Sequence, residues 1–262
     1  MKLYDATGAE FTEVDYGGTT VSELKGKHVI WLGDSVIDYE TPDGINLADL
    51  FASNTGAICH NWAQGGTCFA KGKASNYDPY SFVGMVDALV TGTFTEQETY
   101  AEDRSFTTQV NDMKTFDMSL ADYCVIAFGT NDFWGNMTWI NEEDEFDVNT
   151  SYGAINYGLK TLMKAYPELK ILMIGLQALG QSYIETAAWA KETGDHYNYG
   201  ERYNGFITEL SHKYAIPLLK IQDCSMFNEY TNSTFTSGVP HLSHKGKQRY
   251  AKLIENALKL YY

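Results

Sequence analysis

The sequence contains no metal-binding or redox motif. Its four cysteines form no CxxC pair and no HExxH occurs, and no cluster has the spacing of metal ligands. We therefore expect no metal, no cofactor and four free thiols, at Cys59, Cys68, Cys124 and Cys224. A disulfide between Cys59 and Cys68 in an oxidising compartment is the alternative.

The sequence also shows no pattern typical of a signal peptide or of a membrane-spanning segment. The first residues, MKLYDATGAEF, have no apolar core of the kind that signal peptides carry. No run reaches the roughly eighteen consecutive apolar residues that span a bilayer. We expect a cytoplasmic protein by default, or a domain of a longer exported or particle-borne protein.

Positive charge is scarce. The chain has 19 Lys and Arg against 34 Asp and Glu, which gives a formal charge of −15 at pH 7. This charge repels phosphate backbones and anionic lipid, so neither nucleic acid nor a membrane surface is expected as a partner. Because the chain has 262 residues and is 44% hydrophobic, it can bury a full core. We expect one domain over residues 1–262.

Short apolar runs alternate with helical patterns along the chain. The expected strands are 28–33, 56–63, 123–128, 170–176 and 216–221. The expected helices are 42–51 with Thr41 as N-cap, 106–116, 159–166, 203–214, and 250–258 with Ser243 as N-cap. This alternation predicts a three-layer α/β/α fold, a flavodoxin-like parallel sheet of about five strands with helices on both faces. Pro217 favours an edge position for the last strand, because proline cannot donate to a ladder.

Three segments fit this pattern poorly. Residues 1–27 are expected to be a lead-in, and residues 67–105 and 132–150 are expected to be insertions near the site. Long irregular segments inside a domain are uncommon unless they are functional, so we interpret 67–105 as a wall of the ligand crevice. Its aromatic side chains either contact substrate or, as we prefer, pack the segment onto the body; they are Tyr77, Tyr80, Phe82 and Phe94.

The first strand ends abruptly at Gly33-Asp34-Ser35. Open α/β sheets bind ligands in the crevice at the carboxyl ends of their strands, so Ser35 occupies the place of a nucleophile. The alternative is that Asp34 and Ser35 only cap the following helix, since both residue types are favoured at N-caps.

Three later blocks stand in similar places: Asn61 with Gly66, Gly129-Thr130-Asn131-Asp132, and His241-Leu242-Ser243 before Gly246. With the first block they resemble the four ordered blocks of the SGNH (GDSL-type) hydrolases, over roughly residues 28–258. The resemblance implies that Ser35 is the nucleophile and His241 the general base. It also implies an oxyanion hole formed by the backbone N–H groups of Ser35 and Gly66 and the side-chain amide of Asn131.

The chain departs from that family in one place. The family's Asp three residues before the catalytic His is replaced by Gly238. His244 is a rival base, but it also lacks such an Asp. We expect that His241 is oriented by a backbone carbonyl of residues 237–239, which makes a Ser–His dyad. The Ser237 hydroxyl and Asp223 are the alternatives.

These features predict a serine carboxylester hydrolase that acts through an acyl-enzyme. The aromatic-rich insertions favour acetyl or other short acyl groups on carbohydrate, and the partner is then a small-molecule or glycan ester. A lipase- or thioesterase-like hydrolase of longer acyl esters is one alternative. A non-catalytic glycan-binding module on the same fold is another.

Overall fold

The structure is a computed structural model that describes residues 22–135, 137–176, 198–227, 230–238 and 240–262. Most of the expected lead-in, residues 1–21, lies outside these ranges. None of the helices within them is long and apolar enough to cross a bilayer.

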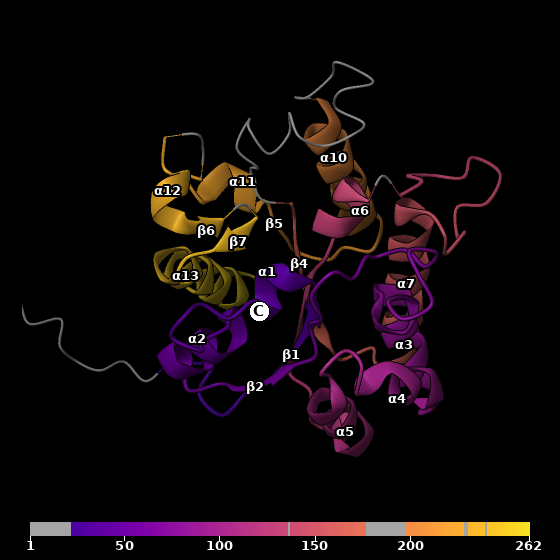
Figure 1. Ribbon diagram of the computed structural model, residues 1–262, viewed down its shortest axis with the longest axis horizontal. Helices are drawn as coiled ribbons and strands as arrows, with labels where there is room; N and C mark the ends of the chain where they lie inside the picture. Colours follow the sequence, from indigo (N-terminus) through magenta and orange to yellow (C-terminus); the bar gives the residue numbers. More distant parts are fainter. Residues whose placement is uncertain (1–21, 136, 177–197, 228–229, 239) are drawn as a thin grey trace, which may run out of the picture.

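A five-stranded parallel sheet forms the centre of the fold (Figure 1). The strand order is β2 (Ile58–Asn61), β1 (His28–Gly33), β3 (Tyr123–Ala127), β4 (Lys170–Ile174) and β5 (Leu218–Leu219). This confirms the predicted sheet. The last strand lies at an edge, as Pro217 predicted, and the Pro217 carbonyl accepts from Met173 N at 3.0 Å.

Helices cover both faces of the sheet, so successive residues of β1 enter two different cores (Figure 1). Val29 and Trp31 pack with α2 (Leu47–Thr55) and α13 (His244–Tyr261). Ile30 and Leu32 enter the second core. Its helices are α3 (Phe82–Thr91), α5 (Thr107–Thr115), α7 (Ser151–Ala165) and α10 (Asn198–Lys213). The three-layer α/β/α prediction is confirmed.

Residues 67–105 are more regular than the sequence suggested. They contain the short helix η1 (Asp78–Tyr80), α3 and α4 (Thr95–Ala101). The periodicity is weak because α3 is buried on nearly all sides and has no polar face to mark its period. Tyr80, Phe82 and Phe94 are core residues, as the packing interpretation predicted.

The second helix begins later than expected. Its N-cap is Asn46, whose side chain accepts from Asp49 N at 2.9 Å, so the prediction of Thr41 as N-cap was wrong. Thr41 is instead part of a turn, in which its hydroxyl bonds Asp43 and Ile45 O. A hydroxyl already engaged in a turn is not free to cap a helix.

The chain ends in a small hairpin and a long helix. The hairpin joins β6 (Thr236–Gly238) to β7 (His241–Leu242) and follows α12 (Asn232–Phe235). Ser243 caps α13 as predicted, accepting from Gly246 N at 3.2 Å. A Cβ at Gly246 would lie 2.1 Å from Phe235 O, so the close approach of α13 to the end of α12 requires glycine here.

Candidate active site

Ser35 is the first residue of α1 (Ser35–Asp38), directly after β1. Asp34 caps this one-turn helix by accepting from Val36 N at 2.9 Å. The Ser35 N–H has no acceptor among the described residues, as expected for a donor in the first turn of a helix. Burial raises the pKa of the fully buried Asp34 to about 7, while Ser35 is only partly buried.

His241 lies beside Ser35. Its Nε2 is 3.1 Å from Ser35 Oγ, although the two residues are far apart in the sequence. The imidazole stacks on the ring of Tyr39, with centroids 4.3 Å apart and ring planes at 12°. Tyr39 follows α1 directly and is itself fixed by Lys247, whose Nζ donates to Tyr39 O at 2.5 Å. The half-buried imidazole is therefore held between a hydroxyl and an aromatic ring.

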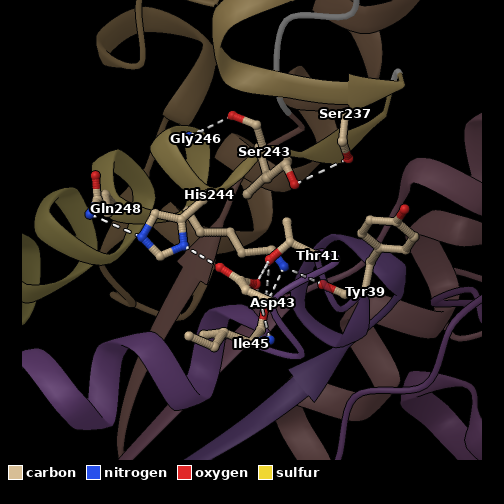
Figure 2. A network of polar contacts seen from close by, with 11 residues as sticks. Tyr39, Thr41, Asp43, Ile45, Ser237, Ser243, His244, Gly246 and Gln248 are labelled. Atoms are coloured by element: carbon tan, nitrogen blue, oxygen red, sulfur yellow. Dashed lines mark hydrogen bonds and ion pairs between the residues drawn. The ribbon is translucent and has the colours of Figure 1, made fainter.

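No carboxylate bonds His241 within the described part of the chain. The Ser237 hydroxyl donates to Leu242 O at 3.4 Å instead (Figure 2). Asp223 lies on α11 (Ile221–Cys224) and forms no hydrogen bond or ion pair with His241 in the described part of the chain. Neither the Ser237 nor the Gly238 carbonyl bonds the imidazole of His241 among the described residues, and residue 239, the third of the predicted acceptors, lies outside them. The contacts that the structure gives the imidazole are those with Ser35 and the Tyr39 ring.

The rival histidine contacts groups other than Ser35. His244 Nδ1 lies 2.8 Å from Asp43 Oδ2, and its Nε2 is 3.1 Å from Gln248 Nε2 (Figure 2). His244 is the first residue of α13, and its side chain is 42% exposed. The structure thus brings His241, and not His244, to Ser35.

Gly66 and Asn131 stand on neighbouring segments. Gly66 has φ +85°, and a Cβ there would lie 2.6 Å from Tyr77 Cε1, so glycine is required both by conformation and by space. Asn131 is the second residue of α6 (Thr130–Trp134), and its Nδ2 donates to Thr67 O at 2.9 Å. This bond ties Asn131 to the loop that carries Gly66.

Charged side chains that the motifs did not indicate hold the same loop. Asp38 Oδ2 accepts from Gly65 N at 3.0 Å, and Arg104 Nη2 donates to Gly65 O at 2.5 Å. Lys73 Nζ donates to Gly66 O. Asp38 lies one turn after Ser35 on α1, but nothing in the sequence around Arg104 or Lys73 points to this loop.

Asp132 anchors the segment after the glycines to α6. Its buried carboxylate accepts from Phe69 N at 2.8 Å, from Ala70 N at 3.2 Å and from Ser151 Oγ at 3.1 Å. Burial raises its pKa to about 6 despite these donors. The sequence could have indicated Asp132, since it follows Asn131 directly, but an acidic residue early in a helix is commonly a solvated one.

The electrostatic surroundings of His241 favour its neutral form. Burial lowers its pKa from 6.5, and the positive charge of Lys247 lowers the pKa further. Lys247 is fully buried with its Nζ bonded to Tyr39 O and Ile45 O. A neutral imidazole with Nε2 facing a hydroxyl can accept that proton, which is the chemistry of a general base.

The described residues contain no group of three His, Cys, Asp or Glu placed to hold a metal ion. All four cysteines are free. Burial raises the pKa of Cys59 to about 12 and that of Cys124 still higher, so neither thiol is poised as a nucleophile at neutral pH.

Comparison with known proteins shows the fold and the family of the chain. No curated protein sequence matches the chain. Solved structures do: a protein from Lactobacillus plantarum is 18% identical, with a TM-score of 0.66 and coverage of 91% of this chain and 99% of its own. Est24, a carbohydrate acetylesterase from Sinorhizobium meliloti, is 14% identical (TM-score 0.53, coverage 90% and 100%). The acetyl xylan esterase AlAXEase is 16% identical (TM-score 0.53, coverage 88% and 99%).

These structures share the fold. The family is shown by the sequence itself, because the model of the GDSL-like Lipase/Acylhydrolase family matches residues 29–254. That range includes Ser35, Gly66, Asn131 and His241. The chain belongs to the GDSL-like lipase/acylhydrolase family, and it is a serine ester hydrolase.

Proposed function

We propose that this hydrolase removes acetyl or other short acyl groups from carbohydrate, through an acyl-enzyme formed on Ser35. The observation that carries the proposal is the 3.1 Å approach of His241 Nε2 to Ser35 Oγ. That distance is within hydrogen-bond reach, as nucleophile and base require.

The reaction proceeds in two halves. His241 Nε2 takes the Ser35 proton while Oγ bonds the ester carbonyl carbon, and the carbonyl oxygen becomes an oxyanion. The C–O bond then breaks, and the same proton passes from His241 to the leaving alcohol. In the second half His241 takes a proton from water, whose oxygen attacks the acyl carbon. Breakdown of this intermediate releases the carboxylic acid and returns the proton to Ser35.

The oxyanion is assigned to the N–H groups of Ser35 and Gly66 and to the amide of Asn131. Neither backbone N–H has an acceptor among the described residues, so both are free to bond an oxygen that arrives at Ser35. Asn131 Nδ2 donates one hydrogen to Thr67 O. Its second hydrogen remains available to the oxyanion, since a side-chain amide nitrogen carries two. Fixed donors of this kind lower the barrier because they need no reorganisation when charge develops.

Tyr39 takes over part of the role that the family gives to an Asp. Its stacking fixes the plane of the His241 ring, and the lowered pKa keeps that ring neutral. The enzyme is thus a Ser–His dyad with an aromatic support. Disabling the Asp of an intact triad costs about 10⁴ in turnover, so the position of the ring has to be secured in another way.

The carbohydrate part of the proposal draws on two observations. Est24 and AlAXEase, which share the fold, are esterases of acetylated carbohydrate by name. Trp134, one turn after Asn131 on α6, is 43% exposed. An exposed indole is a common surface for stacking against a sugar ring.

Acetate release from a panel of acetylated glycans, beside p-nitrophenyl acetate and octanoate, tests the proposal. We expect acetyl esters to exceed octanoyl esters by at least about tenfold in kcat/KM, a difference of about 1.4 kcal/mol. Ser35→Ala abolishes both activities, because its hydroxyl contributes the bond-forming oxygen. His244→Ala is the matched control and retains both.

Three outcomes contradict the proposal. Near-native turnover by Ser35→Ala removes the nucleophile assignment. Equal or reversed chain-length preference favours a lipase-like activity. Hydrolysis of p-nitrophenyl acetate without acetate release from any glycan removes carbohydrate as the substrate class.

A further inference from the structure

The Gly65–Gly66 loop has four backbone polar groups, and three of them bond charged side chains. Gly65 N donates to Asp38 Oδ2 at 3.0 Å, and Gly65 O accepts from Arg104 Nη2 at 2.5 Å. Gly66 O accepts from Lys73 Nζ. The fourth group, the Gly66 N–H, has no hydrogen-bond partner among the described residues.

Gly65 O and Gly66 N belong to one peptide unit. A trans peptide is planar, with its C=O and N–H pointing in opposite directions, so a donor that fixes the carbonyl also fixes the direction of the N–H. Hydrogen bonds in a chain also polarise one another. The Arg104 guanidinium on Gly65 O therefore both aims the Gly66 N–H and makes it a stronger donor.

Arg104 has other contacts besides its bond to the loop. It follows α4, and Arg104 N donates to Tyr100 O at 3.1 Å. The next residue, Ser105, has φ +54°, a conformation that non-glycine residues seldom adopt. The guanidinium carbon lies 4.0 Å from the centroid of the Tyr77 ring, which in turn packs on Gly66. Stacking of this kind fixes the plane of the guanidinium.

We infer that Arg104 is a positioning residue for ester hydrolysis, which sets the Gly66 N–H toward the oxyanion through the carbonyl of Gly65. Asp38 bonds the N–H of the preceding peptide, Gln64–Gly65, so Arg104 is the side chain that bonds the Gly65–Gly66 peptide itself. The inference rests on the proposed oxyanion role of Gly66. It assigns part of the transition-state stabilisation to a side chain that touches neither substrate nor Ser35.

Lys73 provides the matched comparison. It also contacts the Tyr77 ring, with Nζ 4.7 Å from the centroid, and it also bonds a carbonyl of this loop. Its acceptor, Gly66 O, belongs to the following peptide, whose N–H is that of Thr67 and donates to Gln64 O at 3.4 Å. Loss of Lys73 therefore removes a similar contact without touching the Gly65–Gly66 peptide.

The test compares Arg104→Met with Lys73→Met on p-nitrophenyl acetate. Deleting an oxyanion donor costs about 10²–10³ in turnover, and loosening one costs less. We expect Arg104→Met to lower kcat at least about tenfold with KM changed less than about twofold. The inhibition constant of phenylboronic acid, which forms a tetrahedral adduct on a serine, should rise by a similar factor. Arg104→Lys, which keeps a charged donor, should lie between wild type and Arg104→Met.

Rates are expressed per site titrated with a fluorophosphonate, so that a loss of folded protein is not counted as a loss of turnover. The inference is overturned if Arg104→Met stays within about twofold of wild type in kcat, or if Lys73→Met loses as much. A change confined to KM also overturns it. If Arg104→Met does not fold, Arg104→Gln, which is too short to reach Gly65 O, is judged by the same criteria. Activity retained by Ser35→Ala would instead overturn the proposed function.

Discussion

Replacing Asp132 with alanine should destabilise the protein by an amount that depends on pH. The substitution leaves three buried donors without their acceptor: Phe69 N, Ala70 N and Ser151 Oγ. Each such loss costs roughly 1–3 kcal/mol. The substitution also removes a buried charge. The rise of the Asp132 pKa from 3.8 to about 6 corresponds to a penalty of about 3 kcal/mol at pH 7.

The two effects oppose each other, and their balance gives the expected magnitude. At pH 7, three lost hydrogen bonds at about 2 kcal/mol each, less the charge penalty of about 3 kcal/mol, leave a net loss of about 3 kcal/mol. For a chain of this length that lowers Tm by roughly 5–15 °C. A carboxyl whose folded pKa is raised stabilises the fold below its unfolded pKa, and this stability is lost as the pH rises through the folded pKa. The loss caused by Asp132→Ala should therefore be about 1.4 kcal/mol larger at pH 5 than at pH 7.5.

Calorimetric unfolding of the wild type, Asp132→Ala and Ser151→Ala at both pH values checks this expectation. Ser151→Ala removes one of the three hydrogen bonds and keeps the carboxyl, so it should cost about 1 kcal/mol. Because this hydrogen bond lowers the Asp132 pKa, the cost of Ser151→Ala should be larger at pH 7.5 than at pH 5, the opposite trend to Asp132→Ala. An equal Tm for Asp132→Ala and wild type, or a loss that does not grow at the lower pH, would refute the reasoning.

The remaining predictions concern catalysis. His241→Ala should lower kcat by at least about a thousandfold. His244→Ala should change kcat by less than about twofold, since His244 is a partly exposed residue paired with Asp43. A loss of activity confined to the His244 variant would contradict this assignment of the base. Asn131→Ala should lower kcat by about 10²–10³ with little change in KM, and an effect on KM alone would make Asn131 a substrate ligand. Because burial and the Lys247 charge lower the pKa of His241, the acid limb of kcat/KM should have its midpoint below pH 6.5. Lys247→Met should move that midpoint upward, and an unchanged midpoint in the folded variant would contradict the electrostatic role.

The sheet and the segments at its carboxyl edge could be predicted from the sequence, because both depend on local patterns of residue types. Ser35 and Asn131 each follow an apolar strand, and parallel strands bring such positions to one edge. The edge position of the last strand, from Pro217, and the Ser243 cap of α13 also followed from short-range signals. The proximity of His241 to Ser35 came from the family resemblance, since the hairpin that carries His241 has no pattern long enough to place it.

The side chains that support the site could not be predicted from the sequence, for a physical reason. Arg104, Asp38 and Lys247 act through contacts with backbone groups distant in sequence, and a carbonyl leaves no signature in the residue type that bonds it. Lys247 is an instructive case. It belongs to a basic stretch at the start of α13, which is typical of a solvated helix face, and yet it is fully buried between the carbonyls of Tyr39 and Ile45.

The nucleophile and the base also differ in the secondary structure that positions them. Ser35 follows a strand hydrogen-bonded on both sides by β2 and β3, whereas His241 belongs to a hairpin of two short strands outside that sheet. Segments with few ladder hydrogen bonds open at a smaller free energy than the core does. We therefore expect the hairpin, although Leu242 packs in the core, to lose its native position before the sheet does. Catalytic competence then follows the local stability of a few residues near the carboxyl end, and mutations in the hairpin can silence the enzyme without changing its melting temperature.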